Sequence, residues 1–176
     1  MNGAVLLYDT KHGTNRYGLK LGCFCSIDEH GFTRVMAGSF LVNEDEDSFA
    51  WAYSAFSQSF QSTTPKILFT DSDQAMANAR CKVWPDTTYL LCVFHIWKNF
   101  YQHIHPLFMY RKEEWSKVSH SMWWKQCKDT DASDRDSFND NFQSLIDYIT
   151  NNASVRKEVV QKQIPWLQSL MAKKDQ

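Results

Sequence analysis

Short apolar runs of strand length are the feature of this sequence that most strongly limits its fold. They are rich in β-branched and aromatic residues, which favour strands over helices. Two of the runs flank Asp28-Glu29-His30-Gly31, a turn signal that predicts a hairpin. The predicted strands cover residues 4–8, 19–27, 32–42, 66–70 and 87–92.

Helical patterns separate and follow the later runs. One apolar stripe predicts a helix that Asp47 or Ser48 can cap, and it consists of Phe49, Ala52, Tyr53, Phe56 and Phe60. Further helices are predicted at 75–82, 93–104, 138–149 and 155–170, the last of them containing Pro165.

This order of elements predicts an α/β fold with a mixed sheet flanked by helices. Three antiparallel strands followed by two parallel strands are the order expected of an RNase H-like fold. We expect a single domain over residues 1–176, with core motifs at about 4–105, a helical insertion at 106–135 and C-terminal helices at 136–170.

Composition excludes several classes of protein. The net charge of −1 argues against binding nucleic acid by overall charge, so any DNA contact must be local or supplied by a further domain. Five cysteines, an odd number, argue against a disulfide framework and for a reducing compartment. No segment approaches the roughly 20 apolar residues of a membrane helix, and no signal peptide is recognisable. We therefore expect a soluble intracellular protein without membrane association.

Asp9 and Asp71 are the strongest candidates for chemistry, because each follows a predicted buried strand. Sites in open α/β sheets form at the carboxyl ends of strands, and two carboxylates there are suitable ligands for Mg²⁺. The alternative is structural, since Asp is also common where a strand ends in a turn.

Four sequence blocks occur in order over more than half of the chain. They are D-T-K-H-G-T-N-R-Y-G at 9–18, G-S-F-L-V with E-D-E-D-S-F-A-W at 38–42 and 44–51, P-K-I-L-F-T-D-S-D-Q-A-M at 65–76, and W-P with L-C-V-F-H-I-W-K-N at 84–85 and 91–99. Together they resemble the Mutator-like (MULE) transposase domain, which is shared with the far-red-impaired-response transcription factors of plants.

The resemblance implies a DDE-type transposase core that cleaves and transfers DNA strands with Mg²⁺ or Mn²⁺. By it, Asp9 and Asp71 match the first two acids of the triad, and Asn139 stands where the family has Glu. It also implies transposon-end DNA as a partner, a nuclear location, a homo-oligomer and a DNA-recognition domain outside this core.

Three further residues are auxiliary candidates. Cys92 and His95 match the C-x-x-H signature of the family, and His95 projects away from the apolar stripe of its own helix. They could be half of a zinc site, for which His103 and His105 are the nearest other ligands, or Cys92 could be a small buried residue. Asp73 is either a neighbour of the metal site or the N-cap of the next helix.

The third acid leaves the activity open. Asn139 and Asn141 both flank the apolar stripe of their helix, whereas Asp140 points away from it, and Glu113 or Glu114 are possible replacements. An amide oxygen can ligate a cation but brings no charge. The alternative function is therefore a domesticated or decayed, inactive domain acting in DNA-linked transcriptional regulation or protein interaction, and an RNase H-like nuclease unrelated to transposition is a third possibility.

The insertion carries an aromatic cluster, Trp115, Trp123 and Trp124. These rings could stack on exposed bases or pack the insertion against the core.

Overall fold

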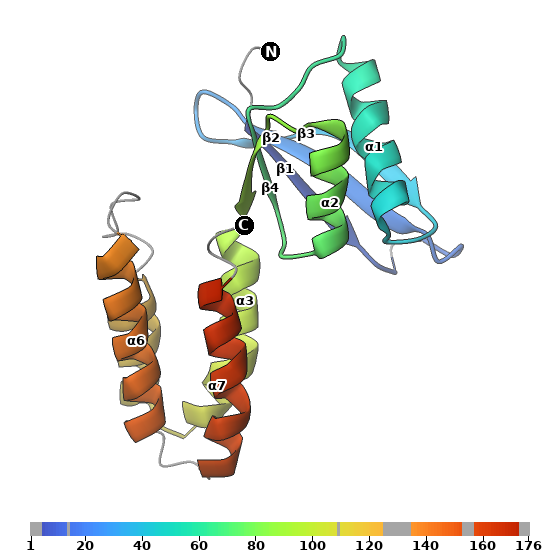
Figure 1. The fold of residues 1–176 in the computed structure, drawn as a ribbon. Coiled ribbons are helices and arrows are strands. Elements are labelled where there is room, and N and C mark those ends of the chain that lie inside the picture. The colour runs from blue at the N-terminus through green and yellow to red at the C-terminus, as the bar shows by residue number, and fades with distance from the viewer. Residues whose placement is uncertain (1–4, 14, 109, 125–134, 153–156, 173–176) are drawn as a thin grey trace. The chain divides into compact units, whose positions relative to one another are not determined.

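The chain divides into two compact units, Met1–Ile96 and Trp97–Gln176. The structure is a computed structural model that describes residues 5–13, 15–108, 110–124, 135–152 and 157–172 (Figure 1). The single domain expected over residues 1–176 stays a prediction.

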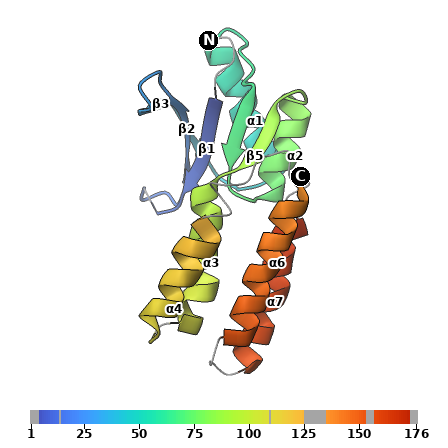
Figure 2. The same ribbon diagram turned by 90° about the vertical axis from the view of Figure 1, so that its left-hand side faces the viewer.

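The first unit contains a five-stranded mixed sheet with the strand order β3-β2-β1-β4-β5 (Figure 2). The β1 strand pairs antiparallel with β2 and parallel with β4, and the outer pairs are antiparallel for β2–β3 and parallel for β4–β5. The predicted RNase H-like arrangement is confirmed. The strands are β1 (Val5–Lys11), β2 (Lys20–Ile27), β3 (Thr33–Leu41), β4 (Ile67–Thr70) and β5 (Thr88–Leu91).

Asp28 builds the predicted turn between β2 and β3. Its Oδ1 atom accepts hydrogen bonds from the backbone N–H groups of His30 at 3.0 Å and Phe32 at 2.9 Å. Gly31 has φ of +81°, a left-handed conformation that glycine adopts without a steric penalty. The turn chemistry read from the sequence is therefore the one that closes this hairpin.

The first strand is longer than predicted, because its pairing with β2 continues past Tyr8 as far as Lys11 opposite Leu21. Asp9 thus lies inside the strand, opposite Cys23, and not directly after its end. The strand predicted from the apolar run was too short, because backbone hydrogen bonding to β2 does not depend on side-chain polarity.

The first helix, α1 (Glu46–Ser59), is capped by Asp45, so the predicted cap at Asp47 or Ser48 was wrong. Asp45 has an extended backbone, and its side chain accepts a hydrogen bond from the Ser48 N–H at 2.9 Å. Glu46 and Asp47 then occupy the first turn, where acidic side chains favour the positive end of the helix dipole.

The core of the first unit lies between the sheet and the helices α1 and α2 (Gln74–Val83), which cover one sheet face (Figure 1). Every second residue of the central strands faces them, so Leu6, Tyr8 and Leu68 are at most 2% exposed. The predicted stripe of α1 is confirmed, with Phe49 and Tyr53 fully buried. Burial of each such side chain contributes roughly 1.5–3 kcal/mol.

Helices make up the second unit. The α3 helix (Val93–Ile104), which has the predicted bounds, crosses into it from the first unit. The predicted C-terminal stripe is confirmed at Phe142, Leu145, Ile146 and Ile149, which are all buried. The remaining elements are η1 (His105–Phe108), α4 (Lys112–Ser116), η2 (Lys117–Trp124), α6 (Arg135–Asn152) and α7 (Lys157–Ala172).

Residues 125–134 of the predicted helical insertion lie outside the described residues, and its last position, Arg135, belongs to α6. Pro165 stands inside α7. Within the described part of the chain, no helix combines the length and the apolar character needed to cross a membrane.

Candidate functional site

Asp9 and Asp71 occupy matching positions on neighbouring parallel strands. Leu7 of β1 pairs with Phe69 of β4. Asp9 follows Leu7 by two positions, and Asp71 follows Phe69 by the same step. Side chains two positions apart on an extended strand point to the same face of the sheet. Both carboxylates therefore lie on the face of Leu7 and Phe69, two positions beyond that pair. The first and fourth strands therefore lie side by side.

The same sheet edge continues to Cys92. Thr70 of β4 pairs with Leu91 of β5, so the next positions along the two strands are Asp71 and Cys92. The Cys92 N–H donates to the Thr70 carbonyl oxygen at 2.6 Å, which extends the pairing by one bond. The carboxyl ends of three adjacent strands therefore carry Asp9, Asp71 and Cys92.

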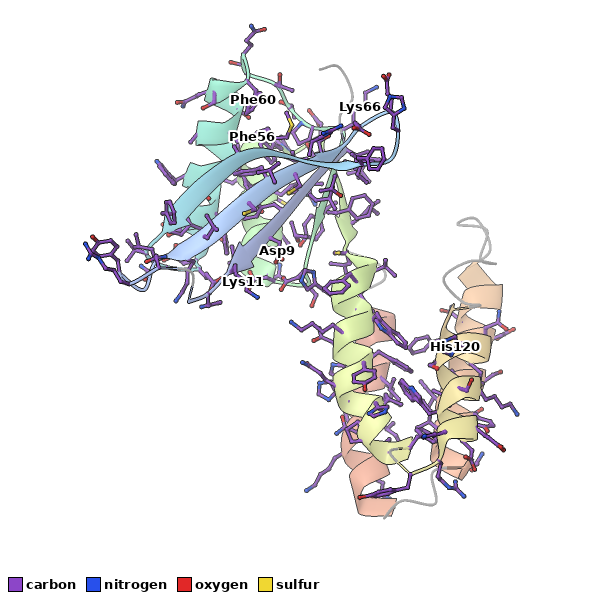
Figure 3. All side chains as sticks on the ribbon, turned by 180° about the vertical axis from the view of Figure 1, so that it is seen from behind. Asp9, Lys11, Phe56, Phe60, Lys66 and His120 are labelled. Carbon is purple, nitrogen blue, oxygen red and sulfur yellow. The ribbon has the colours of Figure 1, made fainter. Side chains whose placement is uncertain are left out.

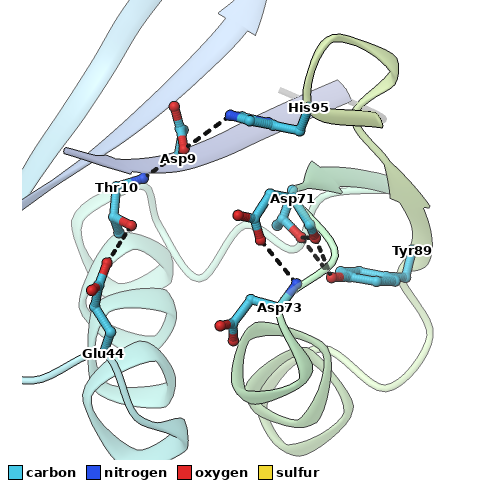
Figure 4. Close-up of polar contacts among 8 residues, drawn as sticks. Asp9, Thr10, Glu44, Asp71, Asp73, Tyr89 and His95 are labelled. Carbon is cyan, nitrogen blue, oxygen red and sulfur yellow. Dashed lines mark hydrogen bonds and ion pairs between the residues drawn. The ribbon is translucent and has the colours of Figure 1, made fainter. Parts of the chain in front are cut away.

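Asp71 is a partly buried carboxylate in an acidic setting. Burial raises its pKa, and the nearby charges of Asp73 and Asp9 raise it further, against the lowering effects of the Asp73 N–H and of His95. The Asp73 N–H donates to Asp71 Oδ1 at 2.9 Å (Figure 4). A carboxylate with these neighbours is destabilised as an anion, and a bound cation would offset this effect.

Below Asp71, two hydroxyl groups fix the backbone from which its side chain emerges. Thr70 Oγ1 donates to the Asp71 carbonyl oxygen at 2.7 Å, and the Tyr89 hydroxyl donates to the same oxygen at 3.1 Å. The Thr70 and Tyr89 oxygens are themselves 2.6 Å apart in the core. The position of Asp71 is therefore held by a buried polar cluster.

Asp9 is more exposed and lies next to His95. The Asp9 side chain is 59% exposed, and its Oδ1 atom is 3.6 Å from His95 Nε2 and accepts from the Thr10 N–H at 2.9 Å. His95 stands in the first turn of α3, where its N–H donates to the Cys92 carbonyl oxygen. The projection of His95 away from its apolar stripe was the sequence signal for this placement.

The Nδ1 atom of His95 is buried and has no hydrogen-bond partner among the described residues. The imidazole is thus attached to the site through Nε2, the atom that faces Asp9.

Asp73 is the N-cap of α2. Its side chain accepts a hydrogen bond from the Met76 N–H at 3.0 Å, and its backbone is extended. The capping alternative stated from the sequence is confirmed. Its carboxylate still adds negative charge beside Asp71.

Glu44 was missed as a candidate, although it stands in one of the family-like blocks. Thr10 Oγ1 donates to Glu44 Oε1 at 2.6 Å (Figure 4). His12 Nε2 lies 2.8 Å from Glu44 Oε2. The sequence signal that could have identified Glu44 is its position three residues after the end of β3. The β1 strand ends at the same edge of the sheet. Glu44 ties the segment after Asp9 to the start of α1.

The described part of the structure brings no further zinc ligands to Cys92 and His95. Among the described residues, no group of three or more His, Cys, Asp or Glu side chains could hold a metal ion. His103 Nδ1 is 2.8 Å from Gln163 Oε1, and His105 stacks on Tyr101 at a centroid distance of 4.4 Å. Both histidines have partners within the second unit.

Position 139, where the family has its third acid, belongs to α6 in the second unit. Asn139 is partly buried, whereas Asp140 and Asn141 are exposed. The side chain of Asn139 thus flanks the buried stripe, as the helical geometry predicted. Its relation to Asp9 and Asp71 stays a prediction.

Trp115 packs within the second unit, as one of the two interpretations of the aromatic cluster proposed. Its ring is 6.1 Å from that of Trp97, 6.3 Å from that of Phe100 and 4.9 Å from that of His105. The side chains of Trp123 and Trp124 lie outside the described residues.

The donor set of the first unit fits a hard divalent cation. Mg²⁺ commonly binds through one or two carboxylates, with water and substrate phosphate oxygens as the other ligands. Asp9 and Asp71 provide two carboxylates at one edge, and burial, together with the nearby charges of Asp73 and Asp9, raises the pKa of Asp71.

A family model, the MULE transposase domain, matches residues 5–99. The match covers all five strands and includes Asp9, Asp71, Cys92 and His95. It ends before α6, so position 139 is not part of it.

Curated proteins from Arabidopsis thaliana are similar to parts of this chain. Protein FAR1-RELATED SEQUENCE 5 is 27% identical over 107 residues, which is 61% of this chain and 14% of that protein. Putative protein FAR1-RELATED SEQUENCE 10 is 31% identical over 94 residues, 53% of this chain and 14% of that protein. The chain therefore spans 14% of the length of these two relatives.

Among solved structures, the catalytic core domain of BIV integrase has a TM-score of 0.34 and 13% identity to this chain. The similarity covers 62% of this chain and 72% of the integrase chain. At this TM-score the likeness carries no argument about the site, and the fold rests on the strand order.

Proposed function

The chain belongs to the MULE transposase domain family, and we propose that it is a DDE-type core for metal-dependent cleavage and transfer of DNA strands. Asp9 and Asp71 are its proposed catalytic carboxylates and ligands of Mg²⁺ or Mn²⁺. The observation that carries the proposal is the pairing of Leu7 with Phe69, because each carboxylate stands the same two positions beyond that pair on adjacent strands.

The chain contributes position and charge to the proposed reaction. The Thr10 N–H orients Asp9 and the Asp73 N–H orients Asp71, so each carboxylate keeps its second oxygen for a cation. The cation would stabilise the charge that develops on the attacked phosphodiester. Such positioning and electrostatic stabilisation account for most of the catalysis in phosphoryl transfer.

In the proposed reaction, water attacks a phosphodiester and the bond from phosphorus to the 3′ oxygen breaks, which leaves a 3′-hydroxyl and a 5′-phosphate. That 3′-hydroxyl then attacks a second phosphodiester, forms a new P–O bond and releases another 3′-hydroxyl. Both steps exchange one P–O bond for another, so no oxidant or reductant is needed. The substrate is DNA at transposon ends, and we propose a nuclear location and a homo-oligomeric assembly on the same family grounds.

The second candidate is a transposase-derived domain that no longer cleaves DNA and acts in transcriptional regulation or protein interaction. Asn139 favours it, because an amide in place of the third acid removes a negative charge from the ligand set. The net charge of −1 favours it as well.

Mn²⁺ binding by calorimetry tests the shared site. Asp9→Asn and Asp71→Asn should each abolish or severely weaken binding, because each removes half of the carboxylate charge. Asp86→Asn is the matched control, since Asp86 is exposed and precedes β5, at the opposite end of that strand from Cys92. Its binding should equal that of the wild type.

A strand-cleavage assay with Mn²⁺ then separates the two candidates. Nicking that disappears in Asp9→Asn and Asp71→Asn supports the transposase core. Mn²⁺ binding without nicking supports the non-catalytic domain. Absence of Mn²⁺ binding in the wild type overturns the metal-dependent proposal.

A further inference from the structure

The segment that follows Asp9 is basic, in contrast to the chain as a whole. From Thr10 to Ile27 the sequence contains Lys11, Arg16 and Lys20 but no Asp or Glu, whereas the net charge of the chain is −1. Glu44, which contacts this segment, is paired with His12 and Thr10. Positive charge is therefore concentrated on the β1–β2 loop, residues 12–19, and on the strand ends that flank it.

These basic side chains are available to a ligand. Lys11 and Arg16 are exposed and Lys20 is partly exposed. None of the three forms an ion pair with a carboxylate among the described residues. They are not needed to hold the fold together.

The backbone of the loop is organised without them. Asn15 Oδ1 accepts hydrogen bonds from the N–H groups of Tyr17 at 3.0 Å and Leu19 at 3.2 Å, and Asn15 Nδ2 donates to the Leu19 carbonyl oxygen at 2.7 Å. Gly13 and Gly18 have φ near +70°, the left-handed region that glycine tolerates. Residues 15–19 therefore form a defined turn that presents Arg16.

Arg16 is also held in place. Its Nη2 atom donates to the Tyr17 hydroxyl at 2.6 Å, and its Cζ atom lies 4.8 Å from the centre of the Tyr17 ring. Tyr17 itself is 69% exposed, so the pair stands in solvent. An ordered guanidinium loses less conformational freedom when it binds a phosphate.

The loop rises from the same sheet edge as the candidate carboxylates. Lys11 is two residues beyond Asp9 on β1 and shares its face, about 6.6 Å farther along the strand. Figure 3 shows Asp9 and Lys11 near one end of the sheet and Lys66 at the other. A DNA strand with one phosphate at the carboxylates would have flanking phosphates within reach of the loop, since phosphates follow at about 3.4 Å per nucleotide along the axis of one strand.

We propose that Lys11 and Arg16 form a contact surface for the DNA backbone, which seats the strand beside Asp9 and Asp71. Lys20 belongs to the other sheet face, because it is two positions from Gly22, the partner of Thr10. This inference rests on the proposed function for the identity of its ligand. Contacts to phosphates are independent of sequence and fix the orientation of the strand.

Fluorescence anisotropy with a labelled DNA duplex of arbitrary sequence tests the surface in the full chain. The variant Lys11→Gln/Arg16→Gln should bind at least tenfold more weakly, and its log–log salt dependence should be shallower by about 2, since each lost phosphate contact removes about 0.9 from the slope. The control Lys66→Gln/Lys162→Gln loses the same charge at two exposed positions elsewhere and should match the wild type.

Circular dichroism on both variants verifies that the fold is retained. Equal DNA affinities for the loop variant and the wild type would overturn the inference, as would an equal loss in the control. Absence of DNA binding in the wild type would overturn it too. Mn²⁺ calorimetry on Asp9→Asn and Asp71→Asn reports the proposed metal site independently, so failure of the metal proposal is distinguished from failure of the DNA surface.

Discussion

Tyr53 contains an unusual polar atom for a core residue. The side chain is 0% exposed, and its hydroxyl has no hydrogen-bond partner among the described residues. Its ring stacks on Trp84 at a centroid distance of 4.8 Å. A buried hydroxyl without a partner destabilises a fold by about 1–3 kcal/mol. The ring of Tyr53 therefore stabilises the core, whereas its hydroxyl lowers the stability of the fold.

Tyr53→Phe should therefore raise the free energy of unfolding, by about 1 kcal/mol. Burial, followed by the nearby Tyr8, raises the pKa of Tyr53 far above its ordinary value of 10.0. As pH rises above about 10, tyrosine ionises in the unfolded chain but not in the fold, so the wild type loses stability. The variant should lose less, as urea unfolding between pH 8 and pH 11 would measure.

Tyr8→Phe is the matched control for this prediction, because the Tyr8 hydroxyl has a partner in Ser39 at 3.3 Å. Removing that bond should not stabilise the protein. If Tyr53→Phe destabilises more than Tyr8→Phe, the Tyr53 hydroxyl has a favourable interaction and its description as partnerless is incorrect.

Asn139 is the residue on which catalytic competence depends if the family resemblance holds at that position. Asn139→Glu should then strengthen Mn²⁺ binding by about tenfold or more, because a carboxylate adds charge to the ligand set. Calorimetry measures the change, and Asn141→Glu, on the other flank of the stripe, is the control. Unchanged affinity in Asn139→Glu would remove position 139 from the site.

At the scale of elements, aspartates cap both helices of the first unit. Asp45 starts α1 and Asp73 starts α2, each by accepting a bond from the N–H three residues later. The cap of α2 was recognisable because one acid precedes its apolar pattern at the correct spacing. In α1 four consecutive acids, residues 44–47, precede the stripe, and only the backbone conformation distinguishes among them.

Asp73→Ala should lower the free energy of unfolding by about 1 kcal/mol through loss of the cap. Asp73→Asn should keep most of the stability, because the amide oxygen still accepts from the Met76 N–H. Thermal unfolding measures both. Mn²⁺ binding should survive in Asp73→Asn, and its disappearance, as expected for Asp71→Asn, would make Asp73 a metal ligand.

At the scale of the whole molecule, the two units have separate cores. Leu68 is fully buried in the first unit, and Leu145 is fully buried in the second. The two candidate carboxylates belong to the first unit, and position 139 belongs to the second. A defect in one core should therefore affect metal binding differently from the same defect in the other.

Leu145→Ala should destabilise the second unit by about 2–5 kcal/mol but leave Mn²⁺ binding by Asp9 and Asp71 intact below the unfolding transition. Leu68→Ala, a substitution of the same size in β4, should weaken both stability and Mn²⁺ binding because Asp71 directly follows that strand. Circular dichroism and calorimetry provide the two readouts. Loss of Mn²⁺ binding in folded Leu145→Ala would show that the units are not independent.

Most of the secondary structure could be predicted from the sequence, whereas the end of β1 and the cap of α1 could not. Periodicity of 2 or 3.6 residues depends on which side of an element faces an apolar core, so it is visible in the order of residues. The stripe from Phe49 to Phe60, the bounds of α3 and the Asp28–Gly31 turn were readable for this reason. The two candidate aspartates were readable as well, because each follows a short apolar run in the sequence.

Which of these residues become neighbours depends on how the strands and helices pack together. Hydrogen bonding between β1 and β4 sets the register that aligns Asp9 with Asp71, and no local pattern specifies a pairing between strands so far apart in the sequence. The approach of His95 to Asp9 and the bond from Thr10 to Glu44 arise in the same way. Contacts between distant segments depend on how whole elements pack, and that information lies in the sum of many weak interactions.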